Sequence, residues 1–481
     1  MKSNRAVNTA VAAAVFCSSA CLAEATQCQT ILAPTYTPPS VASGWTAQLI
    51  ASGLKKPRSI QFDTAGALLV ADAGVGIRRI TFTDNGGTCL AVNQNQLLVN
   101  QTTLNHGLAV SSDGRYIYAS SAEAVFAWGY DAKSGTVSNN PQTIVNNMAN
   151  NDLVTRTLVT SKVQPGMLIV SRGSGDNYDV DALNIASGLG QIRAFDLSNV
   201  TSSSDPYDFD STGRLLGWGL RNAVGVAEHP KTGGIYSLEN SIDGATRDGV
   251  DIHENNPGEE LNFHGYLNST TTHQGGNYGY PRCYAVWDAS SMPDATDLSV
   301  GEQFSMTTNS TLNDTTCADD FVAPRLTFPA HQAPLDIKFN DDGTTAYITF
   351  HGSIDKTNPV GYRISAVAFD AATGEPVDAS DSTTALSDII SNPDLTSCPS
   401  ACFRPVGLAW DSQGRLFMSS DSTGEIYVLT RSTATTSGTA SGTIVTPTAT
   451  ASAKNSASSM WSRDVSMVGL AVLVGTWLTI F

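Results

Sequence analysis

Charged residues, and basic ones above all, are scarce in this sequence. They make up 15% of the 481 residues, and 27 Lys and Arg stand against 44 Asp and Glu, a formal net charge of −17. A surface this acidic repels phosphate backbones, so we expect no nucleic-acid partner. The low charge, the 41 glycines and the abundant Ser and Thr also disfavour long helices and suit many short strands joined by turns.

Motifs of several enzyme classes are missing as well. No GxGxxG, GxxxxGKS/T or GxSxG motif stands where a strand leads into a helix. These absences disfavour nucleotide cofactors and a serine hydrolase. No cysteine pair has the spacing of a zinc site with a histidine nearby, which disfavours a thiolate metal site.

The N-terminus has the three parts of a secretory signal peptide, which we place at residues 1–23. Lys2 and Arg5 are basic, a short apolar stretch follows, and small residues offer a cleavage position at Ala23 or Ala25. The alternative, a membrane helix, needs about 20 apolar residues, and this stretch is shorter.

The C-terminus has the order of parts of a GPI-anchor signal. Residues 431–459 form a Ser/Thr-rich stalk, and residues 460–481 contain a polar spacer and the apolar run Met467 to Phe481. The alternative is a true membrane anchor, but the run is short and no basic cytoplasmic stop follows it. We therefore expect a secreted protein at the cell surface that touches the membrane only through a GPI anchor.

Cysteines and glycosylation sequons fit an extracellular protein. Once the signal peptide is removed, six cysteines allow three disulfides in fifteen pairings. The simplest set without nesting joins Cys28 to Cys89, Cys283 to Cys317, and Cys398 to Cys402. The five sequons, which predict glycosylation, begin at Asn100, Asn199, Asn268, Asn309 and Asn313.

One pattern recurs six times in the middle of the chain: a short apolar strand, a polar Asp/Gly turn and a second apolar strand. The copies begin at Ile60, Leu108, Leu158, Val226, Ile337 and Leu408. The first spacings, 48 and 50 residues, suit four-stranded propeller blades, and the longer ones imply loop insertions. We predict an all-β fold, one six-bladed β-propeller over about residues 28–430; the alternative is a β-sandwich with chance hairpins.

The repeat also predicts which polar residues lie together. A blade's first two strands are antiparallel, so residues that enter the first strand and residues that leave the second share one end of the propeller. The entering residues are Arg58, His106, Arg221, Asn222 and Arg404. The leaving residues are Arg172, Asn177, Glu239, Asn240, His351, Lys356 and Asp421. Guanidinium forks suit planar carboxylates, so this mouth fits a flat polyanion; the alternative is ordinary loop cations paired to carboxylates.

A long insertion before the fifth repeat is rich in oxygen ligands. Its candidates are Asp243, Asp248, Asp251, Glu254, Asn256, Pro257, Glu259 and Glu260. Carboxylates and loop carbonyls are what Ca²⁺ selects. The spacing is not that of an EF-hand, and a solvated acidic loop is the alternative.

Five segments together resemble the quinoprotein sugar dehydrogenases. They are GLRNAVGV at 219–226, ENNPGEELNF at 254–263, GGNYGYP at 275–281, FHGSIDKTNPVGYRI at 350–364 and RPVGLAWDSQGRLFMSSDSTGEIYVL at 404–429. That family includes soluble glucose dehydrogenase and sorbosone dehydrogenase relatives. The chain looks most like the fungal pyranose dehydrogenases that depend on pyrroloquinoline quinone (PQQ). The resemblance implies a six-bladed propeller that uses PQQ and Ca²⁺.

The resemblance also implies roles for single residues. Arg221 and Asn222 match the pair beside the quinone, and the other cofactor-binding candidates at the mouth are Arg58, Arg172, Asn177, His351, Lys356 and Arg404. The carbonyls of Asn256 and Pro257 match the site of the calcium that bridges PQQ. Glu260 and Tyr278 match a second, structural calcium site.

The catalytic base stays open between two histidines. His106 lies in the loop that carries the catalytic histidine of the bacterial glucose enzyme, but its offset to the next strand differs. His351 is followed by Ile354, Asp355 and Lys356 where relatives often have Trp-Asn-Arg. A neutral histidine would take the hydroxyl proton, and an arginine, Arg404 or Arg221, would stabilise developing negative charge.

The predicted activity is dehydrogenation of a pyranose sugar at its anomeric or a neighbouring hydroxyl. Electrons would pass to an external acceptor, such as a cytochrome or a copper enzyme. Two other classes are kept as alternatives. A calcium-dependent lactonase would need metal-binding carboxylates at the axis in place of arginines, and a non-catalytic cell-surface propeller would bind glycans without quinone.

Overall fold

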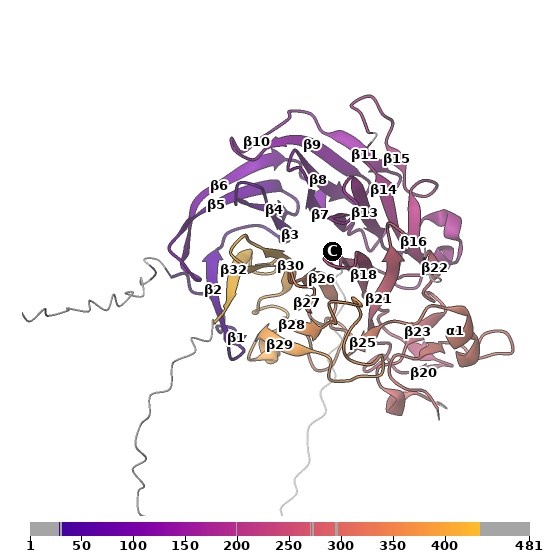
Figure 1. The fold of residues 1–481 in the computed structure, drawn as a ribbon. Helices are drawn as coiled ribbons and strands as arrows, with labels where there is room; N and C mark the ends of the chain where they lie inside the picture. Colours follow the sequence, from indigo (N-terminus) through magenta and orange to yellow (C-terminus); the bar gives the residue numbers. More distant parts are fainter. Residues whose placement is uncertain are drawn as a thin grey trace, which may run out of the picture. The chain divides into compact units, whose positions relative to one another are not determined.

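Each of the six repeats forms the two inner strands of one β-sheet, and the six sheets surround a common axis (Figure 1). The computed structural model describes residues 28, 31–198, 200–269, 271, 274–293 and 297–432. The predicted all-β six-bladed propeller is confirmed. The predicted signal peptide, the anchor signal and nearly all of the stalk lie outside the described residues.

The Asp/Gly turns explain why the repeats form hairpins. In the first repeat the Asp63 carboxylate accepts hydrogen bonds from the backbone N–H groups of Ala65 and Ala67, both at 2.9 Å. Gly66 takes a φ of 83°, which L side chains rarely adopt. The carboxylate therefore closes the turn and the glycine allows the reversal, so that two apolar strands pair side by side.

The first three blades follow the chain from their inner to their outer strands. Blade 1 contains β3 (Pro57–Phe62), β4 (Leu68–Asp72), β5 (Gly76–Asp84) and β6 (Leu90–Asn100). Blade 2 contains β7 (Leu104–Val110), β8 (Tyr116–Ser121), β9 (Val125–Asp131), β10 (Thr136–Val137), β11 (Gln142–Asn146) and β15 (Tyr207–Asp208). Blade 3 contains β12 (Leu158–Thr160), β13 (Met167–Arg172), β14 (Gln191–Asp196), β16 (Arg214–Trp218) and β22 (Gly276–Asn277).

The last three blades include the strand that closes the ring. Blade 4 contains β17 (Ala223–Glu228), β18 (Gly234–Glu239), β21 (Glu259–Tyr266) and β25 (Leu326–Phe328). Blade 5 contains β26 (Pro334–Phe339), β27 (Thr345–Phe350), β28 (Arg363–Ala368), β29 (Ser387–Ser391) and β1 (Ser40–Val41). Blade 6 contains β30 (Pro405–Trp410), β31 (Leu416–Ser420), β32 (Glu425–Arg431) and β2 (Trp45–Ala51).

Blade 6 joins the two ends of the propeller. Its outer strand β2 comes from the start of the described chain and pairs antiparallel with β32 from its end, with Trp45 opposite Arg431. Side chains then fasten neighbouring blades: the Ser419 hydroxyl donates to the Arg58 carbonyl at 2.6 Å, and the Thr349 hydroxyl donates to the Val406 carbonyl at 2.7 Å. The ring is thereby closed through backbone pairing between the two ends of the described chain.

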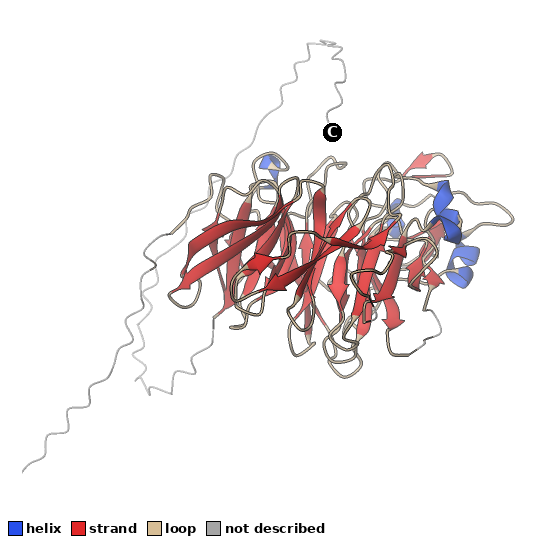
Figure 2. Cartoon of the chain, turned by 90° about the horizontal axis from the view of Figure 1, so that it is seen from above, coloured by secondary structure: helices blue, strands red, loops and turns tan. Residues whose placement is uncertain are grey.

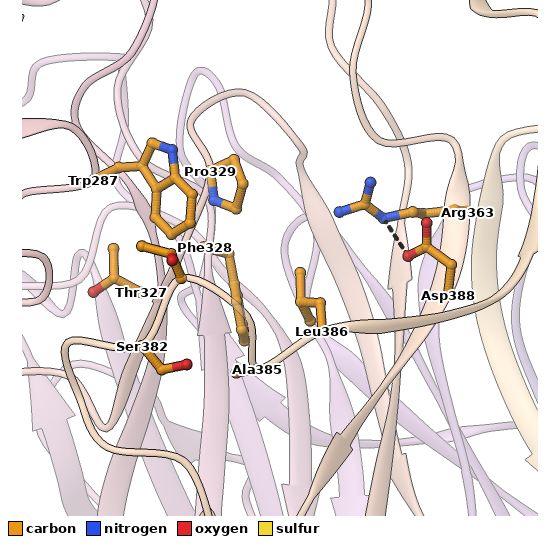
Figure 3. Close-up of a pocket in the computed structure, with 10 residues that line it drawn as sticks. Trp287, Thr327, Phe328, Pro329, Arg363, Ser382, Ala385, Leu386 and Asp388 are labelled. Carbon is orange, nitrogen blue, oxygen red and sulfur yellow. Dashed lines mark ion pairs between the residues drawn. The ribbon is translucent and has the colours of Figure 1, made fainter.

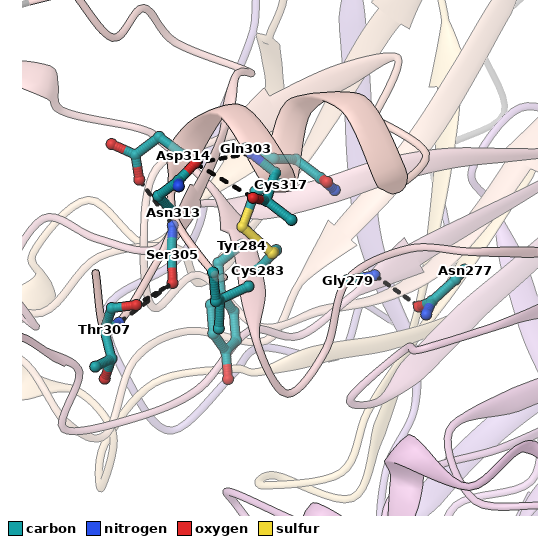
Figure 4. The surroundings of a disulfide bond; sticks show 12 residues. Asn277, Gly279, Cys283, Tyr284, Gln303, Ser305, Thr307, Asn313, Asp314 and Cys317 are labelled. Carbon is teal, nitrogen blue, oxygen red and sulfur yellow. Dashed lines mark hydrogen bonds between the residues drawn. A yellow bond between two sulfur atoms is a disulfide. The ribbon is translucent and has the colours of Figure 1, made fainter. Parts of the chain in front are cut away.

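The long insertion of blade 4 forms its own small elements. They are β19 (Thr246–Arg247), β20 (Val250–Asp251), β23 (Cys283–Ala285), β24 (Gln303–Ser305), the 3₁₀ turn Ala289–Ser291 and α1 (Asp314–Asp320). The Cys283–Cys317 disulfide joins β23 to α1 (Figure 4). The Cys28–Cys89 and Cys398–Cys402 bonds complete the set, so of the fifteen possible pairings the structure has the simplest one, without nesting.

The strands run between two layers of loops, one at each end of the propeller (Figure 2). Further 3₁₀ turns in these loops span Val180–Leu183, Ile185–Ser187 and Leu395–Ser397. Within the described ranges, no helix is both long enough and apolar enough to span a membrane.

Most inner strands are irregular close to one mouth of the propeller. Pairing shifts between Pro57 and Ile60 in β3 and between Leu104 and Leu108 in β7, which are the stretches that hold Arg58 and His106. A shift in strand pairing re-aims a side chain and is common beside active sites. The irregular stretches therefore free these two side chains from the ordinary alternation of the sheet.

Candidate functional site

Five polar residues from four blades form one hydrogen-bonded network at the predicted mouth. Each stands at the start of an inner strand or just past the end of the strand that pairs with it. They are Arg58, His106, His351, Arg404 and Asp421. The antiparallel geometry of the repeat had placed all five at this end, and the contacts between them connect the blades.

Asp421 is the centre of this network. Its Oδ2 accepts a hydrogen bond from Arg58 Nη1 at 2.6 Å, and its Oδ1 lies 2.8 Å from His351 Nε2. Burial acts to raise the pKa of Asp421, but the hydrogen bonds and charges of His351 and Arg58 outweigh it and hold the pKa well below its usual range. Asp421 therefore stays ionised. The repeat pattern predicts its place at the mouth but indicates no role for it.

The network determines which nitrogen of each histidine is free. Arg58 Nε donates to His106 Nδ1 at 3.2 Å, and since a guanidinium only donates, neutral His106 carries its proton on Nε2. His351 turns Nε2 toward the Asp421 carboxylate, so its proton lies on Nε2 and its Nδ1 lone pair is free. Nothing in the described part of the chain bonds to His351 Nδ1. Of the two candidate bases, His351 is the one that presents an available lone pair.

Both imidazoles are neutral near pH 7. Burial lowers the pKa of His351 to about 4, although the hydrogen bond and charge of Asp421 act in the opposite direction. Burial also lowers the pKa of His106 well below its usual range, and the charge of Arg58 adds to the effect. A neutral imidazole is the form that a general base requires.

The two arginines of the network are only partly engaged. Arg404 Nε donates to the His351 carbonyl at 3.0 Å, and its Nη2 donates to the Gly352 carbonyl at 2.8 Å. Arg404 Nη1 and Arg58 Nη2 have no hydrogen-bond partner among the described residues. Each guanidinium therefore keeps one NH₂ group that can bind a carboxylate.

A second group of predicted residues surrounds Arg221. Its Nη2 donates to Asn177 Oδ1 at 2.9 Å and lies 3.4 Å from Asp243 Oδ2. Asn177 Nδ2 also donates to the Asp243 carbonyl at 2.9 Å, and the Asn222 carbonyl accepts the N–H of Asn240 at 3.1 Å. The guanidinium of Arg221 is thus held by the loops of blades 3 and 4.

His331 joins this second group and was missed in the sequence. Its Nδ1 lies 3.4 Å from Asp243 Oδ1, and single ligand atoms of His331, Asp243 and Asp355 lie within 4.8 Å of one another. His331 precedes β26 by three residues, so the geometric rule for entering residues selects it as it selects Arg404. Asp355 appeared in the sequence only as a departure from the family pattern.

Two predicted cofactor residues are bound elsewhere. Arg172 pairs with Asp210 at 2.5 Å and donates to the Ala149 carbonyl at 2.9 Å. Lys356 Nζ donates to the Glu254 carbonyl and lies 3.7 Å from Glu254 Oε2. No contact in the described part of the chain joins either residue to the Asp421 network, and each has the carboxylate partner of an ordinary loop cation.

The Asn256–Pro257 segment is held by its side chain and leaves its carbonyls free. Asn256 Oδ1 accepts the N–H groups of Trp287 at 2.8 Å and Asp288 at 3.1 Å, and Asn256 is fully buried. Neither carbonyl of the Asn256–Pro257 pair accepts a hydrogen bond from a described residue. Fixed, unpaired carbonyls are ligands that Ca²⁺ takes.

Buried carboxylates lie side by side in blade 4. Glu239 in β18 stands opposite Glu260 in β21, and Asn262 Nδ2 donates to Glu260 Oε2 at 2.9 Å. Glu239 Oε2 and Asn262 Oδ1 are buried, and no described residue forms a hydrogen bond with either oxygen. Burial raises the pKa of Glu260 to about 7 and raises that of Glu239 as well, where the charge of Glu260 adds to the effect. Oxygen atoms without partners beside two carboxylates form a donor set for a hard cation.

The polar groups of Tyr278 are already engaged in hydrogen bonds. The hydroxyl donates to the Phe263 carbonyl at 2.5 Å, and the Tyr278 carbonyl accepts Gln303 Nε2 at 3.0 Å. The family resemblance implies that Tyr278 and Glu260 share a calcium site. The structure adds Glu239 and Asn262 to Glu260, because the register of β18 and β21 brings them onto one face of the sheet.

Residues 39–432 match the model of the TrAA12-like family, and the chain belongs to that family. A pyrroloquinoline quinone-dependent sugar dehydrogenase of Hypocrea jecorina is 54% identical over 422 residues, which cover 87% of this chain and 95% of that protein. A pyrroloquinoline quinone-dependent pyranose dehydrogenase of Coprinopsis cinerea is 36% identical over 406 residues, which cover 82% of this chain and 54% of that protein. The chain thus spans about half the length of the Coprinopsis relative.

Solved structures agree with this assignment. The calcium structure of the AA12 family enzyme of Trichoderma reesei superimposes with a TM-score of 0.82 at 55% identity, over 84% of this chain and 99% of that one. The holo form of the PQQ domain of pyranose dehydrogenase from Coprinopsis cinerea gives a TM-score of 0.78 at 36% identity, over 84% of this chain and 99% of that one. The resemblance to the quinoprotein sugar dehydrogenases is confirmed.

Proposed function

We propose that this protein is a PQQ-dependent dehydrogenase that oxidises a hydroxyl of a pyranose sugar. The observation that carries the proposal is the Asp421 network, which sets a free imidazole lone pair beside two half-engaged guanidinium groups. The relatives at 54% and 36% identity, which are named as PQQ-dependent sugar and pyranose dehydrogenases, support the same activity.

The residues at the mouth fit PQQ. The free NH₂ groups of Arg58 and Arg404 match the carboxylates of a flat polyanion. Arg221 and Asn222 would hold it from the side of blade 4. When bound, PQQ supplies a quinone that accepts two electrons, chemistry that the side chains themselves lack.

The chain's own residues then handle the proton. His351 Nδ1 accepts the proton of the sugar hydroxyl, and Asp421 stabilises the imidazolium and holds the ring in place. Arg58 fixes both Asp421 and His106. The Nε2–H of His106 can donate a hydrogen bond to the sugar oxygen, on which negative charge develops as its proton leaves.

Calcium has two proposed positions in this chain. The carbonyls of Asn256 and Pro257 would hold one ion, which would supply the chemistry of a Lewis acid when bound. Glu239, Glu260 and Asn262 would hold a second ion inside blade 4, with a structural role.

We expect the second calcium to stabilise the fold, and more so at higher pH. Burial raises the pKa of Glu260 to about 7. Without a bound cation, the contribution of Glu260 to the free energy of unfolding is therefore fully present below about pH 4 and is lost as the pH rises through 7. Above that pH, a bound cation neutralises the negative charge of the buried carboxylates. At a hundredfold excess over Kd, Ca²⁺ should add about 2.7 kcal/mol, measured as a rise in Tm at pH 7.5 that shrinks at pH 5.

Glu260→Gln is the variant that checks this stabilisation. It keeps the shape of the side chain but removes the charge, so the rise in Tm with Ca²⁺ should disappear. Glu123→Gln, at an exposed position, serves as the matched control. A calcium response that survives in Glu260→Gln would contradict the structural site.

The pH dependence of turnover should follow His351. With a pKa of about 4, the imidazole is neutral and active above about pH 5, and kcat/KM should fall about tenfold per pH unit below 4 as the base becomes protonated. Initial rates in overlapping buffers check this, with thermal unfolding at each pH as the control for acid denaturation. A rate that falls through pH 6.5 would show an unshifted histidine instead.

PQQ binding and sugar-dependent dye reduction test the function directly. The full chain would be titrated with PQQ while tryptophan fluorescence is followed, with and without chelator, and then assayed with a panel of pyranoses and a dye acceptor. Lactone hydrolysis with Ca²⁺ and no PQQ would favour the lactonase class. Sugar binding with neither activity would favour a non-catalytic module.

We also propose that the protein is secreted and held at the cell surface by a GPI anchor. Its electrons would pass to an external acceptor, either a cytochrome or a copper enzyme. Release of the protein from intact cells by a phosphatidylinositol-specific phospholipase tests the anchor. Reduction of a candidate cytochrome in place of the dye tests the acceptor.

A further inference from the structure

A cavity of about 330 Å³ lies between blades 4 and 5 (Figure 3), and none of its lining residues belongs to the Asp421 network. Its walls come from β25, from the start of β28, from the segment that leads into β29 and from Trp287 of the insertion. The volume is at the lower end of the range of about 300–1,000 Å³ for small-molecule sites. A ligand of one ring matches this size.

One side of the cavity is apolar. Trp287 and Pro329 stand on that side in Figure 3, and Phe328, Ala385 and Leu386 complete the wall. Trp287 is partly exposed, and its backbone is fixed because its N–H donates to Asn256 Oδ1 at 2.8 Å. A fixed, partly exposed indole is a rigid surface on which an apolar face can stack.

The other side is formed by an ion pair with unused hydrogen-bonding groups. Arg363 Nε lies 3.0 Å from Asp388 Oδ1, and Arg363 Nη2 donates to Gln332 Oε1 at 2.7 Å. Arg363 Nη1 and Asp388 Oδ2 have no partner within the described ranges. Figure 3 shows the guanidinium extending toward the cavity, opposite Trp287.

The Arg363 side chain is held in place by the residues around it. Its guanidinium lies 5.3 Å from the centre of the Phe350 ring, and its side chain is 20% exposed, against 50% for that of Asp388. The pair thus offers the Nη1 group of Arg363 as a donor and Oδ2 of Asp388 as an acceptor. A ligand with two adjacent hydroxyls satisfies both groups, since one hydroxyl accepts from Arg363 and the other donates to Asp388.

The charge balance selects a neutral ligand. Asp388 compensates Arg363, and the whole chain carries −17, so an added anion gains little here. A ring with an apolar C–H face for the indole and hydroxyls on its edge fits both walls. We infer that this cavity is a second, non-catalytic binding site for a neutral pyranose.

The site does not depend on the redox activity, and methyl glycosides separate the two. A methyl pyranoside has no free anomeric hydroxyl, and no PQQ would be added. Saturation-transfer NMR on the full chain with methyl glycosides of glucose, galactose and xylose should show ring protons in contact with protein. We expect dissociation constants in the millimolar range, about 1–10 mM, as for a single small ring.

Trp287→Ala and Asp388→Asn should each weaken that binding by about tenfold or more, because they remove the stacking surface and the acceptor separately. Asp388→Asn keeps the size of the side chain, and it keeps the test informative if Trp287→Ala unfolds. The matched control is Tyr116→Ala, which removes an aromatic ring from blade 2 and should not change binding. Tyr116 is 48% exposed. Binding in His351→Ala should also persist.

Absence of saturation transfer for every glycoside would overturn the site. Binding that is equally strong in Trp287→Ala and Asp388→Asn would also overturn it, and binding lost in His351→Ala instead would place the sugar at the catalytic mouth. Failure of the redox proposal alone, with no PQQ binding, leaves these glycoside measurements unaffected.

Discussion

Replacing His351 with Ala should lower kcat by about 10²- to 10⁴-fold, the usual contribution of a general base. The reason is the position of the protons: Asp421 holds the His351 proton on Nε2 and leaves Nδ1 free. PQQ affinity should change little, since the substitution removes no guanidinium. Single-turnover reduction by sugar, with PQQ affinity measured in parallel, separates chemistry from binding.

His106→Gln is the comparison that makes this test decisive. Glutamine keeps an N–H donor, and His106 already has its other nitrogen occupied by Arg58. We expect a loss of no more than about tenfold, the size of one neutral hydrogen bond. The reverse order, with His106→Gln the more damaging variant, would assign the base to His106.

Replacing Arg404 with Ala should weaken PQQ binding by about 10- to 150-fold, because a hydrogen bond to a charged group contributes about 1.5–3 kcal/mol. Arg404 keeps one NH₂ group free and lies within the Asp421 network through the His351 carbonyl. Arg404→Lys should recover only part of the affinity, since an ammonium group cannot form the paired contact of a guanidinium. Fluorescence titration with PQQ gives the constants.

Arg115→Ala is the matched control for charge. The Arg115 side chain is 80% exposed and, among the described residues, forms an ion pair with Asp113 alone at 3.8 Å, so its loss should not affect PQQ binding. Tm is measured for both variants, because Arg404 also donates to the backbone of His351 and Gly352. Equal affinities in Arg404→Ala and Arg115→Ala would remove Arg404 from the cofactor site.

The sequence could not select which of the two histidines is the catalytic base. His106 and His351 are equivalent as residue types at one mouth, and both are neutral once buried. What separates them is the hydrogen-bond partner: His106 accepts from a guanidinium, which only donates, whereas His351 donates to a carboxylate, which only accepts. Those bonds join β3 to β7 and the end of β27 to the end of β31, and distances between blades are not encoded in any local pattern.

Arg172 and Lys356 show the limit of the rule that located the mouth. Both leave the second strand of a blade as predicted, yet they contact Asp210 and Glu254 and not the Asp421 network. The strand order assigns a residue to one end of the propeller, but the direction of a long side chain depends on which carboxylate packs next to it. His331 is the reverse case: it enters the first strand of blade 5, as the rule requires, and it lies beside Asp243.

By itself the sequence determined the six hairpins and the end of the propeller at which the polar residues gather. Alternation of apolar residues and Asp/Gly turns are local signals, and they act over about ten residues. Only the tertiary structure decided which of those polar groups bond to one another, where Glu239 meets Glu260 and Asn262, and that Trp287 faces Arg363 across a cavity. Each of these contacts joins separate strands, loops or blades, and depends on how sheets pair and pack, which no single segment specifies.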